Sequence, residues 1–139
     1  MSATAKFQYA MKPGGNGPLD MFPFLPVRLA LGSRFVDVMA LIDSGATISS
    51  IPYDLGQAFG LNWHALTQPL AVGGAHGSVP AKRLDLMTTI GSLPPRLLVY
   101  AWVNTNNYPL VLGSADFFFN YDVHLCRRHK YFEISPATP

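Results

Sequence analysis

The sequence predicts an all-β domain, a closed barrel or sandwich with one or two short helices. Twelve glycines and twelve prolines are scattered between short apolar runs, which is typical of small domains built from strands and turns. The chain has 139 residues and one cysteine, so it can build a single core and forms no internal disulfide. Apolar residues make up 49% and charged residues 13%, a balance that favours surface buried in an oligomer.

Charge and hydropathy argue against several classes of partner. The net charge of +2 is too small to indicate a nucleic-acid partner. Apolar stretches stay well short of the roughly 18 residues that a membrane helix needs, so no membrane association is expected. The N-terminal stretch lacks the apolar segment of a signal peptide, and a single cysteine suits a reducing compartment. We therefore expect a cytoplasmic protein.

The first third of the chain predicts an arm followed by a hairpin. Residues 6–11 alternate in polarity and can form a short strand, and the glycine- and proline-rich residues 13–18 form a loop. Two apolar runs, residues 25–31 and Arg34–Ile42, flank Gly32-Ser33, which predicts a β-hairpin. The chain is accordingly divided into an N-terminal arm, residues 1–24, which is a candidate strand of a dimer interface, and a domain over residues 25–139.

The remaining elements follow from turn residues. Proline at position 52 and glycine at position 60 bound a segment of one or two helical turns, residues 52–59. Apolar runs on both sides of the glycine-rich residues 73–77 predict a second hairpin, residues 68–72 with 78–83. The other expected elements, in chain order, are strands 84–90 and Arg96–Val103, a buried strand 110–113, a helix 114–120 capped by Ser114, and a closing hairpin of residues 121–125 and 130–134.

The stretch A-L-I-D-S-G-A-T, residues 40–47, places a carboxylate directly after an apolar strand. Burying Asp43 costs several kcal/mol unless it is hydrogen-bonded, and Gly45 permits a tight turn whose N–H groups can bind it. Hydrolysis by activated water needs a base and an acid, which two aspartates about 3 Å apart supply together. Of the seven aspartates only Asp43 stands in an Asp-Ser-Gly context. The simplest second carboxylate is therefore Asp43 of another copy, across a two-fold axis.

Three blocks in order resemble the retropepsin-like aspartic proteases, the half-size family with retroviral, bacterial and retroelement members. They are F-V-D-V-M-A-L-I-D-S-G-A-T at residues 35–47, A-V-G-G-A-H-G-S-V-P at residues 71–80 and L-V-L-G-S-A-D-F-F at residues 110–118. The resemblance implies a retropepsin-like barrel, equivalent to half of a two-lobed aspartic protease. It also implies a homodimeric endopeptidase that acts on peptides or proteins without a cofactor or metal.

The resemblance also implies a role for each residue of this chain that matches one of the family's motifs. Catalysis would belong to Asp43, with Ser44 bonding across the dimer axis and Gly45 contacting the carboxylate and the substrate. Leu112 and Gly113 would form the strand beneath the active loop. The substrate-binding residues would come from the rest of that loop and from a flap at the glycine-rich hairpin: Ala46, Thr47, Gly73, Gly74, Ala75, His76 and Gly77.

The chain also departs from the retroviral pattern. Thr47 and Ser114 stand where retroviral members carry an acidic residue and an arginine, so their ion pair within the subunit is expected to be absent. Retroviral enzymes build the dimer sheet from the chain termini. Whether residues 6–11 or 130–134 do so in this chain is left open.

Other functions find less support in the sequence. His124, Cys126 and His129 suggest a zinc site, but strand alternation sets His129 apart and no second cysteine is present. A serine hydrolase is not indicated, because Gly-x-Ser-x-Gly is absent around Ser44. The remaining alternative is a catalytically inactive dimer of the same fold that binds peptides or a partner protein.

Overall fold

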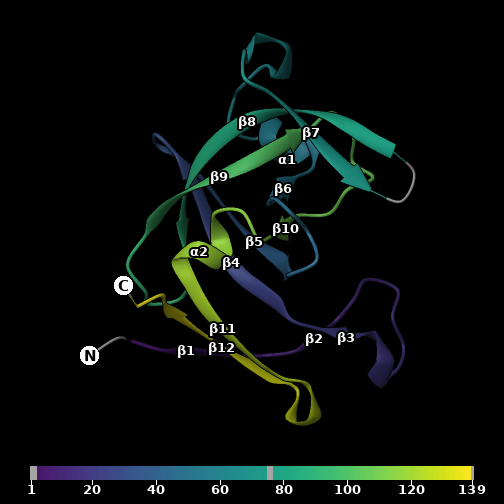
Figure 1. Ribbon diagram of the computed structural model, residues 1–139, viewed down its shortest axis with the longest axis vertical. Coiled ribbons are helices and arrows are strands. Elements are labelled where there is room, and N and C mark those ends of the chain that lie inside the picture. Colours follow the sequence, from purple (N-terminus) through teal and green to yellow (C-terminus); the bar gives the residue numbers. More distant parts are fainter. Residues whose placement is uncertain (1–2, 75–76, 139) are drawn as a thin grey trace.

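The computed structural model describes residues 3–74 and 77–138, and its centre is a seven-stranded sheet that closes on itself (Figure 1). The strand order is β4-β5-β10-β6-β9-β8-β7, and an additional pairing of β4 with β8 closes the ring. The all-β prediction is confirmed. The strands are β4 (Phe24–Leu31), β5 (Arg34–Ile42), β6 (Ser50–Ile51), β7 (Pro69–Gly74), β8 (Gly77–Thr89), β9 (Arg96–Val103) and β10 (Val111–Leu112).

Two smaller sheets lie below this ring in Figure 1. One has the order β1-β12-β11, from β1 (Ala5–Gln8), β12 (Tyr131–Pro136) and β11 (Tyr121–Cys126), and the other pairs β2 (Ala10–Met11) with β3 (Met21–Phe22). The single strand expected over residues 6–11 is therefore two strands in different sheets. The break falls at Tyr9, whose ring is buried and whose N–H donates to the Lys130 carbonyl at 2.8 Å.

The helical segments are short. They are α1 (Tyr53–Gln57), α2 (Phe117–Asn120) and the 3-10 turns η1 (Pro18–Asp20), η2 (Trp63–Ala65) and η3 (Arg127–His129). Both predicted helices exist, but the second begins after Asp116 and not at Ser114, which therefore does not cap it. None of the helices in the described ranges is long and apolar enough to cross a membrane.

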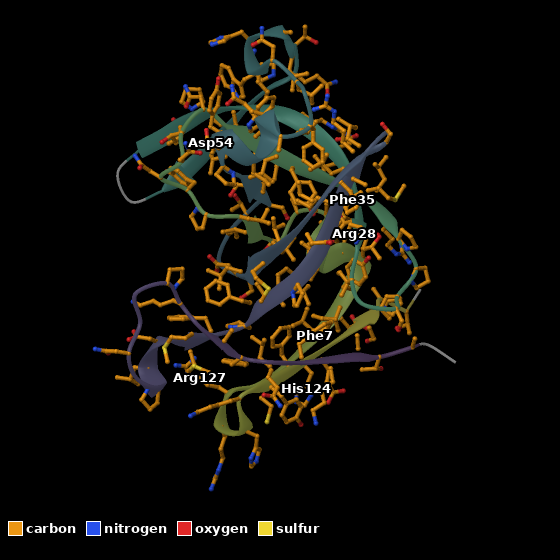
Figure 2. The ribbon with its side chains drawn as sticks, turned by 180° about the vertical axis from the view of Figure 1, so that it is seen from behind. Phe7, Arg28, Phe35, Asp54, His124 and Arg127 are labelled. Atoms are coloured by element: carbon orange, nitrogen blue, oxygen red, sulfur yellow. The ribbon has the colours of Figure 1, made fainter. Side chains whose placement is uncertain are left out.

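The β4–β5 hairpin forms as its alternation predicts. Leu25, Val27 and Leu29 point into the core, while Arg28 faces outward and pairs with Asp37 at 2.8 Å. Gly32 adopts φ +60° in the two-residue turn, a conformation that glycine reaches without strain. In Figure 2 Arg28 and Phe35 lie together on this hairpin, with the guanidinium 4.1 Å from the ring centroid.

The two strands expected over residues 78–83 and 84–90 are one strand, β8, of 13 residues. Successive parts of it pair with three neighbours: β7 through residues 77–82, β9 through 81–88 and β4 through 87–89. One long strand can close the ring because it bends from one neighbour to the next. Its side chains Leu84 and Leu86 lie beside those of Tyr100 and Leu98 on the paired strand β9 and belong to the same buried core.

Candidate active site

Asp43 follows the last residue of β5 and is anchored there by the main chain. Its N–H donates to the Leu112 carbonyl at 3.0 Å. Strand β10 runs parallel to β5, with Leu112 opposite Ile42, and the Leu112 side chain is fully buried. The start of the Asp-Ser-Gly turn is thus fixed to the core of the domain.

The turn then holds the carboxylate by its own backbone. The Gly45 N–H donates to Asp43 Oδ1 at 2.9 Å, and the Ala46 N–H donates to the Asp43 carbonyl at 3.1 Å. An aspartate that accepts from the backbone two residues later forms a compact Asx turn. A Cβ at position 45 would lie 3.2 Å from Oδ1, so a side chain there would crowd the carboxylate.

Gly113 brings the strand after β10 into contact with the active loop. A Cβ on Gly113 would lie 2.8 Å from the Ile48 carbonyl carbon and oxygen, closer than Cβ atoms in folded proteins approach non-bonded atoms. Directly after it, the Ser114 N–H donates to the Ala46 carbonyl and the Ala115 N–H to the Thr47 carbonyl, both at 2.8 Å. Residues 113–115 therefore support the whole loop that carries Asp43.

Two serine side chains add to this support. Ser49 is fully buried, and its Oγ accepts from the Gly113 N–H at 3.0 Å. Ser114 Oγ donates to the Ser44 carbonyl at 3.1 Å. Neither role was predicted from the sequence, where Ser114 was expected to cap a helix and stands at the position of an arginine in retroviral members. Its hydroxyl instead links the Asp43 loop to the segment after β10.

A cavity of about 340 Å³ opens beside Asp43. It is lined by four other residues that the sequence analysis placed in the site, namely Gly45, Ala46, Thr47 and Gly73. Among its lining residues, all within the described part of the chain, Asp43 alone is acidic. The lining also includes residues that the sequence analysis did not select, among them Ile48, Val72, Tyr108 and Pro109. The position of Tyr108-Pro109 just before the Leu-Val-Leu-Gly strand was the available signal for the last two.

The other predicted site residues either lie near this cavity or are not among the residues that the structure describes. Ser44 is exposed to solvent and does not line the cavity. Gly74 and Gly77 are opposite each other at the end of the β7–β8 hairpin. Ala75 and His76 fall outside the described residues.

The described residues contain no group of three or more His, Cys, Asp or Glu side chains that could hold a metal ion. His124, one of the three side chains considered for zinc, instead lies with its Nδ1 4.0 Å from Glu133 Oε1. Cys126 is a half-buried free thiol.

Comparisons with known proteins agree with this geometry. The family model described as aspartyl protease matches residues 26–105, which is more than half of the chain. Among solved structures, a retropepsin-like aspartic protease from Rickettsia conorii matches with a TM-score of 0.64 at 11% sequence identity, over 98% of this chain and 94% of that chain. Among curated proteins, none matches. The structural likeness shows a retropepsin-like fold, and the family match shows that the chain belongs to the aspartyl protease family.

Proposed function

We propose that the protein is an aspartic endopeptidase whose active site forms when two copies bring their Asp43 carboxylates together. The observation that carries the proposal is the position of the Asp43 carboxylate. Backbone hydrogen bonds with Leu112 and Gly45 fix Asp43 in place. It lines a cavity in which, among the residues that the structure describes, no second acidic side chain is present. Four other aspartates have described side-chain partners elsewhere: Asp20 with Lys12, Asp37 with Arg28, Asp85 with Arg83, and Asp116 with the Val99 N–H. A second copy is the direct source of the missing acid.

The chemistry needs one proton on the pair. Two carboxylates a few ångströms apart do not both ionise, so they share that proton. The ionised Asp43 takes a proton from a water molecule while the oxygen of that water attacks the peptide carbonyl carbon. The protonated Asp43 gives its proton to the carbonyl oxygen. When the C–N bond of the tetrahedral intermediate breaks, the carboxyl group that took the water proton gives it to the leaving nitrogen. A hydroxyl of the intermediate gives its proton to the other carboxylate as the carbonyl reforms, so the pair again holds one proton.

The substrate would bind as an extended peptide. Main-chain hydrogen bonds to the loop after Asp43 and to the β7–β8 hairpin would add it as a further strand. Gly73 lines the cavity from the hairpin, and nothing lies within 4 Å of where its Cβ would be, so a peptide backbone can approach there. In this proposal the hairpin acts as the flap, and Ser44 bonds to the partner across the axis.

The test compares two aspartate variants on a mixed peptide library at pH 4 to 7. Asp43→Asn should abolish cleavage while the protein still dimerises. Asp37→Asn is the matched control, because Asp37 is exposed, pairs only with Arg28 in the described structure and lies outside the cavity. A transition-state-like inhibitor of aspartic proteases should block the wild-type cuts. Cleavage by Asp43→Asn at the wild-type rate would refute the proposal.

Mixing subunits tests the shared site. Excess Asp43→Asn protein should exchange with wild-type subunits and suppress wild-type cleavage, because each mixed dimer has only one Asp43 carboxylate in its active site. Excess Asp37→Asn protein should not suppress it. A fully active monomer, measured by light scattering at the assay concentration, would contradict a site shared by two copies. Tight peptide retention without any cut would indicate a binding dimer instead of an enzyme.

A further inference from the structure

Asp116 has a backbone conformation that an aspartate rarely adopts. Its φ is 74° and its ψ is −56°, which is close to the strained γ-turn with positive φ. Among the residues that the structure describes, Lys130 is the other non-glycine residue with a positive φ. Lys130 is exposed at the end of η3, whereas Asp116 directly follows the segment that supports the Asp43 loop. Strain of this kind persists where surrounding contacts hold the residue in place.

The position of Asp116 between two fixed neighbours requires a sharp turn. Before it, Ala115 forms a parallel bridge with Ile48, and the Ala115 N–H donates to the Thr47 carbonyl at 2.8 Å. After it, Phe117 is fully buried and begins α2. Figure 1 shows α2 between the ring of strands and the β11–β12 hairpin. The chain therefore changes direction at Asp116 as it passes from the active loop into the core.

The Asp116 side chain holds this turn by two hydrogen bonds. Its Oδ2 accepts from the Val99 N–H at 2.5 Å, and its Oδ1 accepts from the Asn120 side-chain amide at 3.1 Å. The same amide donates to the Asp116 carbonyl at 2.6 Å. One carboxylate thus connects the turn both to strand β9 and to the end of α2.

Val99 has a free N–H because the neighbouring strand is short. Strand β6 pairs with β9 at residues 101 and 102, and next to this pairing the Ala101 N–H donates to the Ser49 carbonyl at 2.8 Å. Two residues earlier on the same edge of β9, the Asp116 carboxylate takes the place of a strand carbonyl. The Ser49 hydroxyl also accepts from the Gly113 N–H at 3.0 Å. Both ends of the segment 113–116 are therefore anchored on β9.

We infer that Asp116 is a positioning residue for catalysis, which through its bond to Val99 fixes residues 113–115 against the loop that carries Asp43. The inference rests on the proposed function and adds a residue that does not line the cavity. The two Asp43 carboxylates share a proton only when they are a few ångströms apart. A misplacement of about 1 Å can lower the rate of an enzyme about hundredfold, so the support of this loop bears directly on kcat.

The test separates the side chain of Asp116 from its backbone conformation. Asp116→Gly removes the carboxylate and allows the positive φ without strain, so the turn should still form. Asp116→Asn keeps an oxygen that can accept from the Val99 N–H, and asparagine tolerates a positive φ better than most residues. Asn120→Ala removes only the amide that supports the carboxylate. Circular dichroism and urea denaturation check the fold and the stability of each variant.

Asp116→Gly should lower kcat about ten- to hundredfold with little change in KM. The Ki of a transition-state-like inhibitor should rise by the factor by which kcat/KM falls, because both depend on the placement of the Asp43 pair. Asp116→Asn should recover most of the lost kcat, and Asn120→Ala should cause a smaller loss of the same kind.

Thr88→Val is the control for a general loss of stability. It removes a buried hydroxyl that is hydrogen-bonded to Tyr100 at 2.8 Å and leaves the turn at Asp116 unchanged. At a temperature where every variant is folded, Thr88→Val should keep the wild-type kcat.

Three results would overturn the inference. If Asp43-dependent cleavage occurs but Asp116→Gly keeps the wild-type kcat, Asp116 only stabilises the fold and the proposed function stands. If Thr88→Val loses as much kcat as Asp116→Gly, general destabilisation explains the loss. If wild-type protein cuts no peptide, the proposed function falls and the role of Asp116 falls with it. Asn120→Ala takes the place of Asp116→Gly in these comparisons if the glycine variant does not fold.

Discussion

The Ser114 hydroxyl donates a hydrogen bond to the carbonyl of Ser44, 70 positions earlier in the chain, with 3.1 Å between the two oxygen atoms. Ser44 directly follows Asp43, so this bond restrains the peptide that leaves the carboxylate. It acts together with the Ser114 N–H, which donates to the Ala46 carbonyl at 2.8 Å. The link between the active loop and the strand beneath it is therefore a hydroxyl bond, where retroviral members have an ion pair.

Ser114→Ala should reduce kcat more than it raises KM, because the hydroxyl positions the loop and is exposed away from the cavity lining. A net hydrogen bond contributes about 0.5 to 1.5 kcal/mol, which corresponds to a loss of up to about tenfold in rate. Steady-state kinetics and a thermal melt measure the two effects. Ser33→Ala, in the β4–β5 turn, is the matched control and should leave kcat at the wild-type value. Equal kinetics for the two variants would remove the positioning role of Ser114.

Gly113→Ala should destabilise the domain strongly. The new methyl group would lie 2.8 Å from the Ile48 carbonyl atoms and 2.9 Å from the Ala46 oxygen, so the active loop must move. Overpacking of this kind costs about 1 to 3 kcal/mol. Gly73→Ala serves as control for stability, since its Cβ would meet nothing within 4 Å. Chemical denaturation measures the stability of both variants. Equal free energies of unfolding for Gly113→Ala and Gly73→Ala would show that the loop accommodates the methyl group without loss of stability.

Local patterns made part of this structure predictable. Alternation over residues 25–42 and the Gly32-Ser33 turn predicted the β4–β5 hairpin, and the same strand predicted where Asp43 would emerge. The Asx turn of Asp43 could be expected too, because an aspartate two residues before a glycine can accept that glycine's N–H. In each case the interacting residues are close in sequence.

Contacts between distant segments were not predictable in the same way. Ser49 and Gly113 are 64 positions apart, and nothing near Ser49 in the sequence indicates that its hydroxyl accepts from that glycine. The split of residues 6–11 between two sheets depends on Tyr9 meeting the Lys130 carbonyl from the other end of the chain.

Acidification should loosen the arm through Asp20. The Asn16 N–H bonded to Asp20 at 3.0 Å, together with Lys12, lowers the pKa of this carboxyl below its usual value. A lowered pKa in the folded state means that the contribution to stability is complete above the ordinary value and is lost as pH falls through the lowered one. The Asn16 amide resonance in an NMR titration should therefore move with a midpoint below about 3.9, the ordinary aspartate value.

Asp20→Asn is the control for that titration and should remove the shift of the Asn16 resonance. A midpoint at or above the ordinary aspartate value would mean that the bond from Asn16 does not hold the arm in solution.

Thr88 on β8 and Tyr100 on β9 form a buried polar pair whose contribution to stability can be tested. Both side chains are fully buried, the Thr88 hydroxyl donates to the Leu86 carbonyl at 3.2 Å, and it can then accept from the Tyr100 hydroxyl at 2.8 Å. Burial raises the pKa of Tyr100 well above its usual value, so the phenol stays protonated and able to donate.

Thr88→Val should cost about 1 to 3 kcal/mol of unfolding free energy, because it leaves that phenol without an acceptor. Adding Tyr100→Phe should recover part of the loss, since an unpaired buried hydroxyl is worse than none, and urea denaturation of both single variants and the double variant measures the coupling. Strictly additive losses would show that the two hydroxyls do not depend on each other.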